Sequence, residues 1–339
     1  MSARGAAALV VVLIVTLMSA ACGGGDSRTT ESPSAEPAGD QIAHTENLNP
    51  QDAAIERGRY LVEGPAHCLH CHSEIDWQAP GHPTVSGRKA AGQPIPEASI
   101  PGLVYAANLT ADAETGIGAW TDAELGVAIR EGIGRDGRRL FPLMPYMAYA
   151  HMSDQDLAAV IAFLRTLDPV SNKVPPRELP QPVIDSLPPH QSIAGPVAHP
   201  VESNPVEYGA YLATLGNCVD CHTPFTQGQP IMSLAYAGGR VLDGPWGIIA
   251  SPNITSDPSG IPHYNEDLFI STMRTCRSGA RELHHLMPCR YYNNMTDEDL
   301  AAIFAWVQTL PPIQHRVSNT DSPTPCALCG GVHGLGDMN

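Results

Sequence analysis

The feature that most constrains this chain is an internal duplication built around two copies of the pattern Cys-x-x-Cys-His, at residues 68–72 and 218–222. Matching blocks surround both copies in the same order: GRYL with GAYL, ANLT with PNIT, LMPY with LMPC, and MSDQDLAAVIAFLRTL with MTDEDLAAIFAWVQTL. A repeat of about 150 residues is too long for a solenoid unit, so the duplication predicts two domains.

The N-terminal 21 residues carry one arginine, Arg4, and then an apolar run that ends in small residues before Cys22. The run is short for a membrane span and predicts an export signal. Small residues before a cysteine resemble a bacterial lipoprotein cleavage site, with Cys22 as the lipidated N-terminus; ordinary signal cleavage nearby is the alternative. We therefore expect an exported protein on the periplasmic side, anchored to the membrane by lipid.

Composition divides the remaining chain. Residues 22–50 are polar and rich in Gly, Ser and Pro, which predicts a disordered tether. Residues 169–205 contain ten prolines, which predicts an extended linker. The domains are then 51–168 and 206–312, followed by a cysteine-containing tail, 313–339.

Helical spacing dominates both domains. Apolar residues at 157, 160, 161 and 164, and again at 300, 303, 304 and 307, fall on one helix face. Ser153 and Thr296 precede these helices as N-caps, each with an acid three residues later. No segment alternates like a strand, so we predict an all-α, loop-rich fold. Aromatic residues are only 6% of the chain, and such small domains need a large bound apolar group to complete a core.

The Cys-x-x-Cys-His pattern is typical of covalent haem attachment. Cys68 and Cys71, and likewise Cys218 and Cys221, are spaced to form thioethers with the two vinyl groups of one porphyrin, and His72 and His222 then follow as axial ligands of the iron. A zinc site needs further ligands, and the first domain has no other cysteine. A thioredoxin-like pair needs a βαβ setting, which the pattern lacks. Two haem c groups are therefore predicted.

The opposite axial ligand separates an electron carrier from an enzyme. Met144 and Met287 match in the repeat, and each stands in a loop before a proline. A second matched pair, Met152 and Met295, directly precedes the caps and is explained by hydrophobic packing on the helix. We predict that Met144 and Met287 are the ligands. His284 and His285 are the alternative for the second domain.

These blocks resemble class I c-type cytochromes, and more closely the cytochrome subunits of bacterial membrane-bound alcohol and gluconate dehydrogenases. The resemblance covers both domains. It implies one covalent haem per domain, Met144 and Met287 as iron ligands, and contacts of the following residues with the haem edge: Asn108, Thr110, Trp120, Asn253 and Thr255. Turn formation is the alternative role for these residues. Those subunits typically carry three haem domains, whereas this chain has two.

Four cysteines remain, and none precedes a histidine. In an exported protein an even number predicts disulfides. Pairing of Cys276 with Cys289 would brace the Met287 loop, and Cys326 would then pair with Cys329. A cross-pairing of the tail onto the second domain and a zinc site built from all four cysteines are the alternatives.

The prediction for function is electron transfer without catalysis, because two filled axial positions leave no place for a substrate at the iron. A dehydrogenase or quinol-oxidising donor and a downstream cytochrome or oxidase would be the partners. The alternative is a dihaem peroxidase or thiosulfate-dehydrogenase type of enzyme with one open or unusually ligated iron. A formal net charge of −16 argues against nucleic acid as a partner.

Overall fold

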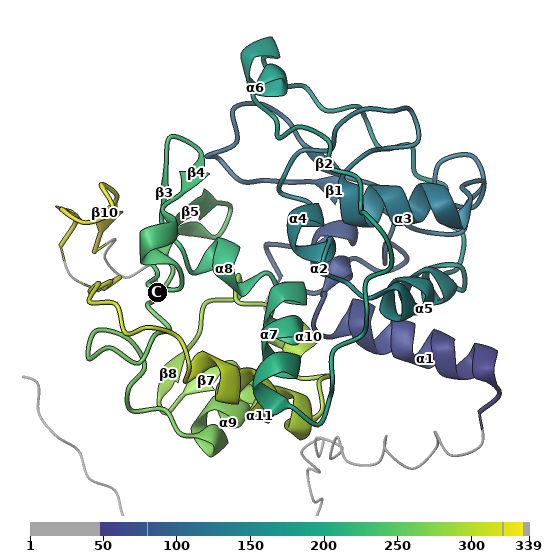
Figure 1. Cartoon of the computed structure of the whole chain (residues 1–339). Coiled ribbons are helices and arrows are strands. Elements are labelled where there is room, and N and C mark those ends of the chain that lie inside the picture. The colour runs from purple at the N-terminus through teal and green to yellow at the C-terminus, as the bar shows by residue number, and fades with distance from the viewer. Residues whose placement is uncertain (1–47, 80, 321, 335–339) are drawn as a thin grey trace, which may run out of the picture. The chain divides into compact units, whose positions relative to one another are not determined.

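The computed structural model describes residues 48–79, 81–320 and 322–334 (Figure 1). The expected export signal, Cys22 and nearly all of the tether lie outside these ranges. The described residues belong to one unit of the chain, so the two copies of the repeat pack together. No helix in these ranges is long and apolar enough to cross a membrane.

The regular structure of the first half, residues 48–168, is mainly helical, and loops make up the rest. Its helices are α1 (Pro50–Glu63), α2 (Cys68–His72), α3 (Asp122–Glu131), α4 (Tyr146–Tyr149) and α5 (Asp154–Leu164). Asn49 caps α1 by accepting hydrogen bonds from the amides of Gln51 and Asp52, so this helix begins at the end of the expected tether. One short antiparallel pair, β1 (Gln93–Pro94) with β2 (Tyr105–Ala106), joins the loops.

The second half, residues 205–312, repeats this helix order. Its helices are α7 (Pro205–Leu215), α8 (Cys218–Cys221), α9 (Glu266–Thr275), α10 (Cys289–Tyr292) and α11 (Asp297–Val307). Between α8 and α9 lie β3 (Phe225–Thr226), β4 (Gln229–Pro230), the 3-10 turn η2 (Met232–Leu234), β5 (Val241–Gly244) and β6 (Gly247–Ala250). The hairpin of β7 (Arg277–Ser278) and β8 (Arg281–Glu282) follows α9.

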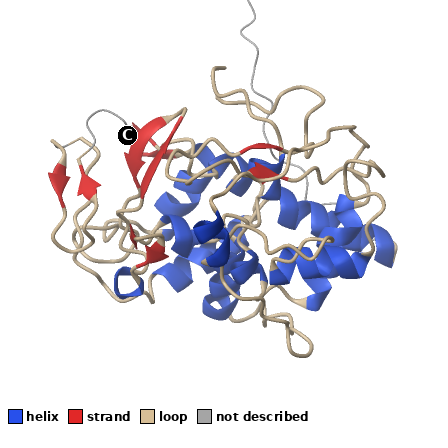
Figure 2. Ribbon diagram, turned by 90° about the horizontal axis from the view of Figure 1, so that it is seen from above, coloured by secondary structure: helices blue, strands red, loops and turns tan. Residues whose placement is uncertain are grey.

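The expectation of a fold without strands is therefore corrected. The described residues contain five antiparallel pairs, the fifth being β9 (Thr324–Pro325) with β10 (Val332–His333) in the tail. Their strands are two to four residues long, too short to show an alternating pattern in the sequence. Figure 2 shows them among the loops around the helices. Each pair closes a loop or turn, and among the described residues none pairs with a third strand.

The linker runs mostly without regular structure and lies against the first half. A five-residue helix, α6 (Gln181–Asp185), interrupts it. Leu103 and Glu178 exchange backbone hydrogen bonds, and the guanidinium of Arg139 donates to the carbonyl oxygens of Ile184 and Leu187. These bonds satisfy polar backbone groups that a proline-rich segment cannot pair within itself.

The first and last helices of each half cross at close range. Figure 1 shows α5 along α1, and α7 packs on α11 in the same way. A Cβ placed on Gly58 would lie 1.9 Å from the carbonyl oxygen of Ala159, and one on Gly209 would lie 1.9 Å from that of Ala302. Both glycines occupy the same place in the repeat. Only glycine permits this backbone contact.

The two predicted N-caps are confirmed, since Ser153 and Thr296 accept hydrogen bonds from the amides of Asp156 and Asp299. The carboxylates of these two aspartates do not return to their own caps. Tyr60 donates to Asp299 and accepts from the Thr296 amide, which lies 3.2 Å away. We call the contact surface between the two halves the seam. On its other side the same contacts recur with the roles of the halves exchanged.

In that reversed copy, Tyr211 donates to Asp156 at 2.6 Å and accepts from the Ser153 amide at 3.2 Å. Tyr60 and Tyr211 are equivalent in the repeat, and so are Asp156 and Asp299. Reciprocal contacts of this kind define a two-fold relation, here between the halves of one chain.

The seam is symmetric in shape but not in charge. Arg57 forms a two-pronged ion pair with Asp156, at 2.9 and 3.0 Å, whereas Tyr208 stands at the place of Arg57 in the second half. Burial alone would raise the pKa of Asp156, but the hydrogen bond and charge of Arg57 outweigh it and lower that pKa. Burial raises the pKa of Asp299, which the hydrogen bond from Tyr60 only partly offsets.

We expect Gly58→Ala and Gly209→Ala each to lower the free energy of unfolding by at least about 2 kcal/mol, because the helices must move apart. Gly126→Ala in α3 is the matched control, since its Cβ would meet only the Leu157 side chain at 3.4 Å. That change should be neutral or stabilise by about 0.5 kcal/mol. Urea unfolding measures the free energy of unfolding of all three variants. An equal change in all three would contradict the close helix crossing.

We expect Asp156→Asn to cost roughly 3 kcal/mol at neutral pH, because Arg57 loses its buried partner. The folded-state pKa of Asp156 lies below the unfolded one, so this cost shrinks as the pH falls below about 4. Asp299→Asn is the matched variant across the seam. It should change stability by less than about 0.5 kcal/mol or stabilise at neutral pH, since the folded-state pKa of Asp299 is raised. Denaturant unfolding of both variants at pH 7 and pH 3 measures these costs. Equal losses of stability in the two variants at pH 7 would contradict the expected difference.

Candidate haem-binding sites

Each Cys-x-x-Cys-His segment begins on a left-handed residue, His67 with φ 34° and Asn217 with φ 49°. This turn separates the segment from the preceding long helix. The thiols of Cys68, Cys71, Cys218 and Cys221 are all free, so neither pair is a disulfide.

A buried tyrosine holds each segment from behind. The hydroxyl of Tyr149 donates to the carbonyl oxygen of Ala66 at 2.7 Å, and that of Tyr292 donates to Gly216 at 3.1 Å. Both carbonyls stand two residues before the first cysteine of their pair. The two segments are therefore positioned by equivalent contacts.

The axial histidines of both segments bond to the same kind of partner, a backbone carbonyl oxygen. Nδ1 of His72 lies 2.7 Å from the carbonyl oxygen of Ala107, and Nδ1 of His222 lies 2.8 Å from that of Pro252. A carbonyl accepts only, so each Nδ1 carries the proton and Nε2 keeps its lone pair for a metal. Burial lowers the pKa of both imidazoles, partly offset by these carbonyls, which favours the neutral, ligating form.

Two glycines complete this arrangement, and the sequence analysis missed them. The amides of Gly92 and Gly238 donate to the carbonyl oxygens of His72 and His222, at 2.8 and 2.7 Å. Both glycines have positive φ, and a Cβ would strike the loop that carries the histidine's carbonyl partner. The matched Ala-Gly pairs at 91–92 and 237–238 were the available signal.

The Asn-x-Thr blocks orient that loop. The Asn108 side chain accepts from the amide and hydroxyl of Thr110, at 2.9 and 2.7 Å, and donates to Val170 at 2.8 Å. Asn253 and Thr255 repeat this pattern. These bonds favour the alternative role of turn formation, and a contact of these residues with the haem edge stays a prediction. They are enclosed by protein and already bonded, and they hold the carbonyl that precedes each asparagine.

Met144 and Met287 occupy equivalent turns. Each is partly buried against the core and accepts, through its carbonyl oxygen, a hydrogen bond from the amide two residues later. Met152 and Met295 are 1% and 2% exposed, as packing residues should be. Trp120 is partly buried against the same core. The iron-ligand role of Met144 and Met287 stays a prediction, as does a haem contact of Trp120.

The disulfide between Cys276 and Cys289 is present, with Cα atoms 5.6 Å apart. It closes the loop that carries the β7–β8 hairpin and Met287. Because the first half has no such bridge, the second methionine loop is braced more firmly. The predicted pairing of Cys326 with Cys329 is not found, since both thiols are free. Each of their sulfurs instead lies 3.3 Å from a histidine nitrogen.

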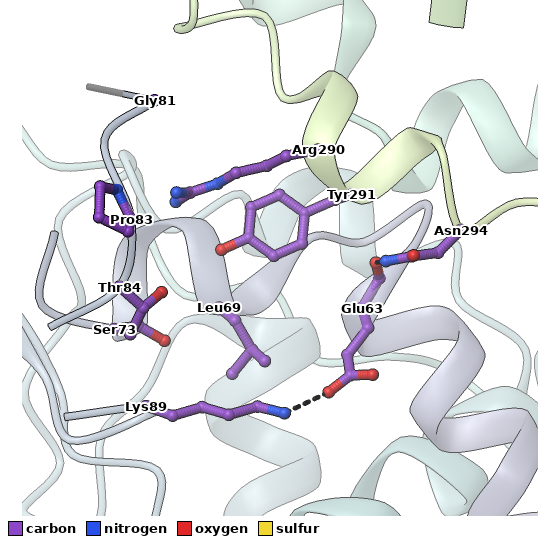
Figure 3. Close-up of a pocket in the computed structure, with 10 residues that line it drawn as sticks. All are labelled: Glu63, Leu69, Ser73, Gly81, Pro83, Thr84, Lys89, Arg290, Tyr291 and Asn294. Atoms are coloured by element: carbon purple, nitrogen blue, oxygen red, sulfur yellow. Dashed lines mark hydrogen bonds and ion pairs between the residues drawn. The ribbon is translucent and has the colours of Figure 1, made fainter. Parts of the chain in front are cut away.

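Helix α10 covers the first Cys-x-x-Cys-His segment from the second half. In Figure 3, Arg290 and Tyr291 reach over Leu69 of α2, and together they line a pocket of about 340 Å³. The ring of Tyr292 packs edge-on against His67, with ring centres 5.6 Å apart. Since the Tyr292 hydroxyl also holds the second segment, one side chain touches both sites.

His67 and His70 are therefore seam residues. His70 packs edge-on against Tyr291, with ring centres 5.9 Å apart. Burial, together with the charges of His67, Arg290 and His285, lowers the pKa of His70 to about 3. The imidazole is neutral at physiological pH.

His284 and His285 lie in the loop before Met287, but His285 faces the first half. Its ring centre is 3.8 Å from that of His82 and 5.6 Å from that of Trp77. Burial and the neighbouring His284 and His82 lower the pKa of His285 to about 3. This histidine is engaged in the seam, which weakens the alternative that it replaces Met287.

Comparison with known proteins identifies the family. The cytochrome c family model matches residues 55–168. The diheme cytochrome c-type protein of Cereibacter sphaeroides is 30% identical over 256 residues, which covers 73% of this chain and 83% of that protein. The chain belongs to the cytochrome c family. The resemblance to c-type cytochromes that the sequence motifs indicated is thereby confirmed.

Two further relatives of this cytochrome are dehydrogenase subunits. The cytochrome c subunit of the quinone alcohol dehydrogenase of Gluconobacter oxydans is 27% identical, over 86% of this chain and 62% of that subunit. The gluconate 2-dehydrogenase cytochrome c subunit of Pantoea cypripedii is 32% identical, over 76% of this chain and 60% of that subunit. The cytochrome thus spans about three fifths of the length of these subunits.

The residues present fit covalent haem. Each site has two free thiols at the required spacing and an imidazole with Nε2 left for iron. Among the described residues, four buried side-chain nitrogen atoms make no hydrogen bond to the protein: Nδ1 of His70, Nε1 of Trp246, Nε2 of His285 and Nη2 of Arg290. Buried polar atoms normally have a hydrogen-bonding partner, so these four atoms are ones that a bound group could satisfy.

We expect replacement of both Cys276 and Cys289 by serine to cost roughly 3 kcal/mol of stability, because an unfolded loop of this length loses its closure. In hydrogen exchange followed by mass spectrometry, amides at 277–288 should exchange faster. Peptides covering 137–145, the matching loop without a disulfide, are the control. Unchanged exchange at 277–288 would contradict the bracing role.

Proposed function

We propose that this cytochrome c holds two haems and carries electrons between a dehydrogenase and a downstream acceptor. The observation that carries the proposal is the recurrence of one complete arrangement at both Cys-x-x-Cys-His segments. Each segment has two free thiols and a histidine whose Nδ1 donates to a backbone carbonyl. A glycine amide donates to the carbonyl oxygen of that histidine, and a tyrosine hydroxyl donates to the carbonyl two residues before the first cysteine. The second half would thus be a second cytochrome c domain.

When bound, a haem with two axial ligands supplies reversible one-electron redox chemistry without an open position for substrate. The protein's own contribution is to hold both histidines neutral and oriented and to keep the two sites at a fixed separation. Tyr292 contacts both segments, and the reciprocal bonds of Tyr60 and Tyr211 lock the halves together. Such rigidity suits a carrier, because little reorganisation is needed as charge enters and leaves.

The donor is proposed from the relatives. Named subunits of alcohol and gluconate dehydrogenases align with most of this chain, so a membrane-associated dehydrogenase of a small organic substrate is the partner class that we favour. A soluble cytochrome or terminal oxidase would be the acceptor. We further propose that the protein is exported and held at the membrane by lipid on Cys22, on the strength of the N-terminal sequence.

The dihaem enzyme remains the second candidate function. It requires one high-spin or unusually ligated iron, and His284 or His285 would have to supply the change. Spectroelectrochemical titration separates the two functions. Two low-spin haems per chain at positive potential support the carrier, while one high-spin centre, or one at strongly negative potential, would contradict it.

Met144→Ala and Met287→Ala should each lower the potential of one haem only. The expected shift is roughly 0.2 V, a quarter of the ~0.8 V range that axial ligands command. Met147→Ala is the matched control, because Met147 lies in α4, three residues after Met144, with 55% of its surface exposed. A full titration curve for each variant gives both potentials. Unchanged potentials in a methionine variant would contradict that ligand.

A further inference from the structure

The tail contains a group of four side chains that the haem sites do not use. His315, Cys326, Cys329 and His333 each direct one nitrogen or sulfur atom into a common space, and these four atoms all lie within 4.8 Å of one another. His315 is 1% exposed, Cys329 4% and His333 7%. Both thiols are free. Buried thiols and imidazoles gathered in this way are the ligands that zinc prefers in structural sites.

We propose that His315, Cys326, Cys329 and His333 bind one zinc ion, which fastens the C-terminal tail to the second half. Two thiolates and two imidazoles make a complete four-coordinate set, so no position is left for water or substrate. The site is structural rather than catalytic. It goes beyond the proposed electron transfer and does not depend on it.

The hydrogen bonds of the histidines support this assignment. Nδ1 of His315 lies 3.0 Å from the carbonyl oxygen of Ala237, and Nδ1 of His333 lies 3.3 Å from that of Arg316. Each Nδ1 is therefore the protonated nitrogen. The two Nε2 atoms face sulfur, His315 toward Cys326 and His333 toward Cys329, each at 3.3 Å. Metal-bound histidines are commonly oriented by such a carbonyl on the opposite nitrogen.

The backbone around the cysteines has the form expected of a metal-binding turn. The amide of Cys326 donates to the carbonyl oxygen of Gly331 at 2.7 Å, and Gly330 donates back to Cys326 at 2.9 Å. The Gly331 amide also points at the sulfur of Cys329, 3.4 Å away. An N–H directed at sulfur stabilises a thiolate, which is the form that binds zinc.

Space for the ligands is provided by Gly239 of the second half. A Cβ on this residue would lie 2.6 Å from Cε1 of His315 and 2.9 Å from Nε2 of His333. The φ of +89° also favours glycine. The site is thus shaped by a segment distant in sequence, as well as by the tail itself.

A disulfide between Cys326 and Cys329 is the alternative that the sequence suggested. In the structure each sulfur faces a histidine nitrogen. An exported protein meets an oxidising compartment, where unprotected neighbouring thiols become a disulfide. Zinc has no redox chemistry of its own and would keep both cysteines as thiolates. The two states are therefore exclusive and can be told apart.

The site lies next to the second haem-binding segment. Ala237, which accepts from His315, precedes Gly238, and the Gly238 amide holds the carbonyl of His222. The Asn253 side chain also donates to the carbonyl oxygen of His315 at 3.3 Å. Zinc would thus stabilise the same loops that position His222.

The test is metal analysis of the full-length protein, purified without chelator from zinc-replete cells. Elemental mass spectrometry should find one zinc per chain. Zinc K-edge absorption should show two sulfur ligands at about 2.3 Å and two nitrogen ligands at about 2.0 Å. Replacement of both Cys326 and Cys329 by serine, and separately His333→Ala, should lower the zinc content roughly tenfold or more. Haem absorbance per chain shows that each variant has folded.

His263→Ala is the control, because His263 is exposed on the second half and outside the site. It should retain its zinc. Absence of zinc together with a Cys326–Cys329 disulfide in peptide mass spectrometry would overturn the proposal, as would full zinc retention in the double serine variant. Neither result would touch the electron-transfer proposal, which rests on haem content and potentials.

Discussion

The contact of Gly58 with the carbonyl of Ala159, repeated by Gly209 and Ala302, is the constraint on which the rest of the molecule depends. It fixes how the first and last helices of each half cross. The first helix leads into the Cys-x-x-Cys-His segment, and the last helix follows the methionine loop. The crossing therefore brings the two ends of each binding site together, and the tyrosine at the end of the methionine loop then secures the cysteine segment.

The two halves are also joined by hydrogen bonds to each other's helix caps. Their capping aspartates turn away from their own helices and accept a tyrosine from across the seam. Arg57 adds a charge to one of the two contacts and Tyr208 adds none to the other. Duplication has thus kept the geometry while the electrostatics diverged, so the two contacts respond differently to pH.

The local features could be predicted from the sequence, and those that depend on distant partners could not. The caps at Ser153 and Thr296 and the Cys276–Cys289 bridge could be predicted from spacing, and both are present. The carboxylates of Asp156 and Asp299 bond to a tyrosine of the other half, and nothing local in the sequence shows that it approaches. The bonds of Asn108 and Asn253 could not be predicted either, because their acceptors come from residues about 60 positions later. His315 was likewise too far from Cys326 to be read as its partner.

The reciprocal seam has a consequence for the linker. Since the halves are joined by side chains that recur on both sides, the 37 residues of 169–205 need not hold the two binding sites at their distance. Apart from the residues that bond to the first half, such as Val170, Glu178 and Leu187, that segment can vary in composition while the internal spacing stays constant. Diversification within this architecture would then concentrate on the outer surfaces that meet other proteins. The relative placement of the two binding sites inside the molecule would be inherited almost unchanged.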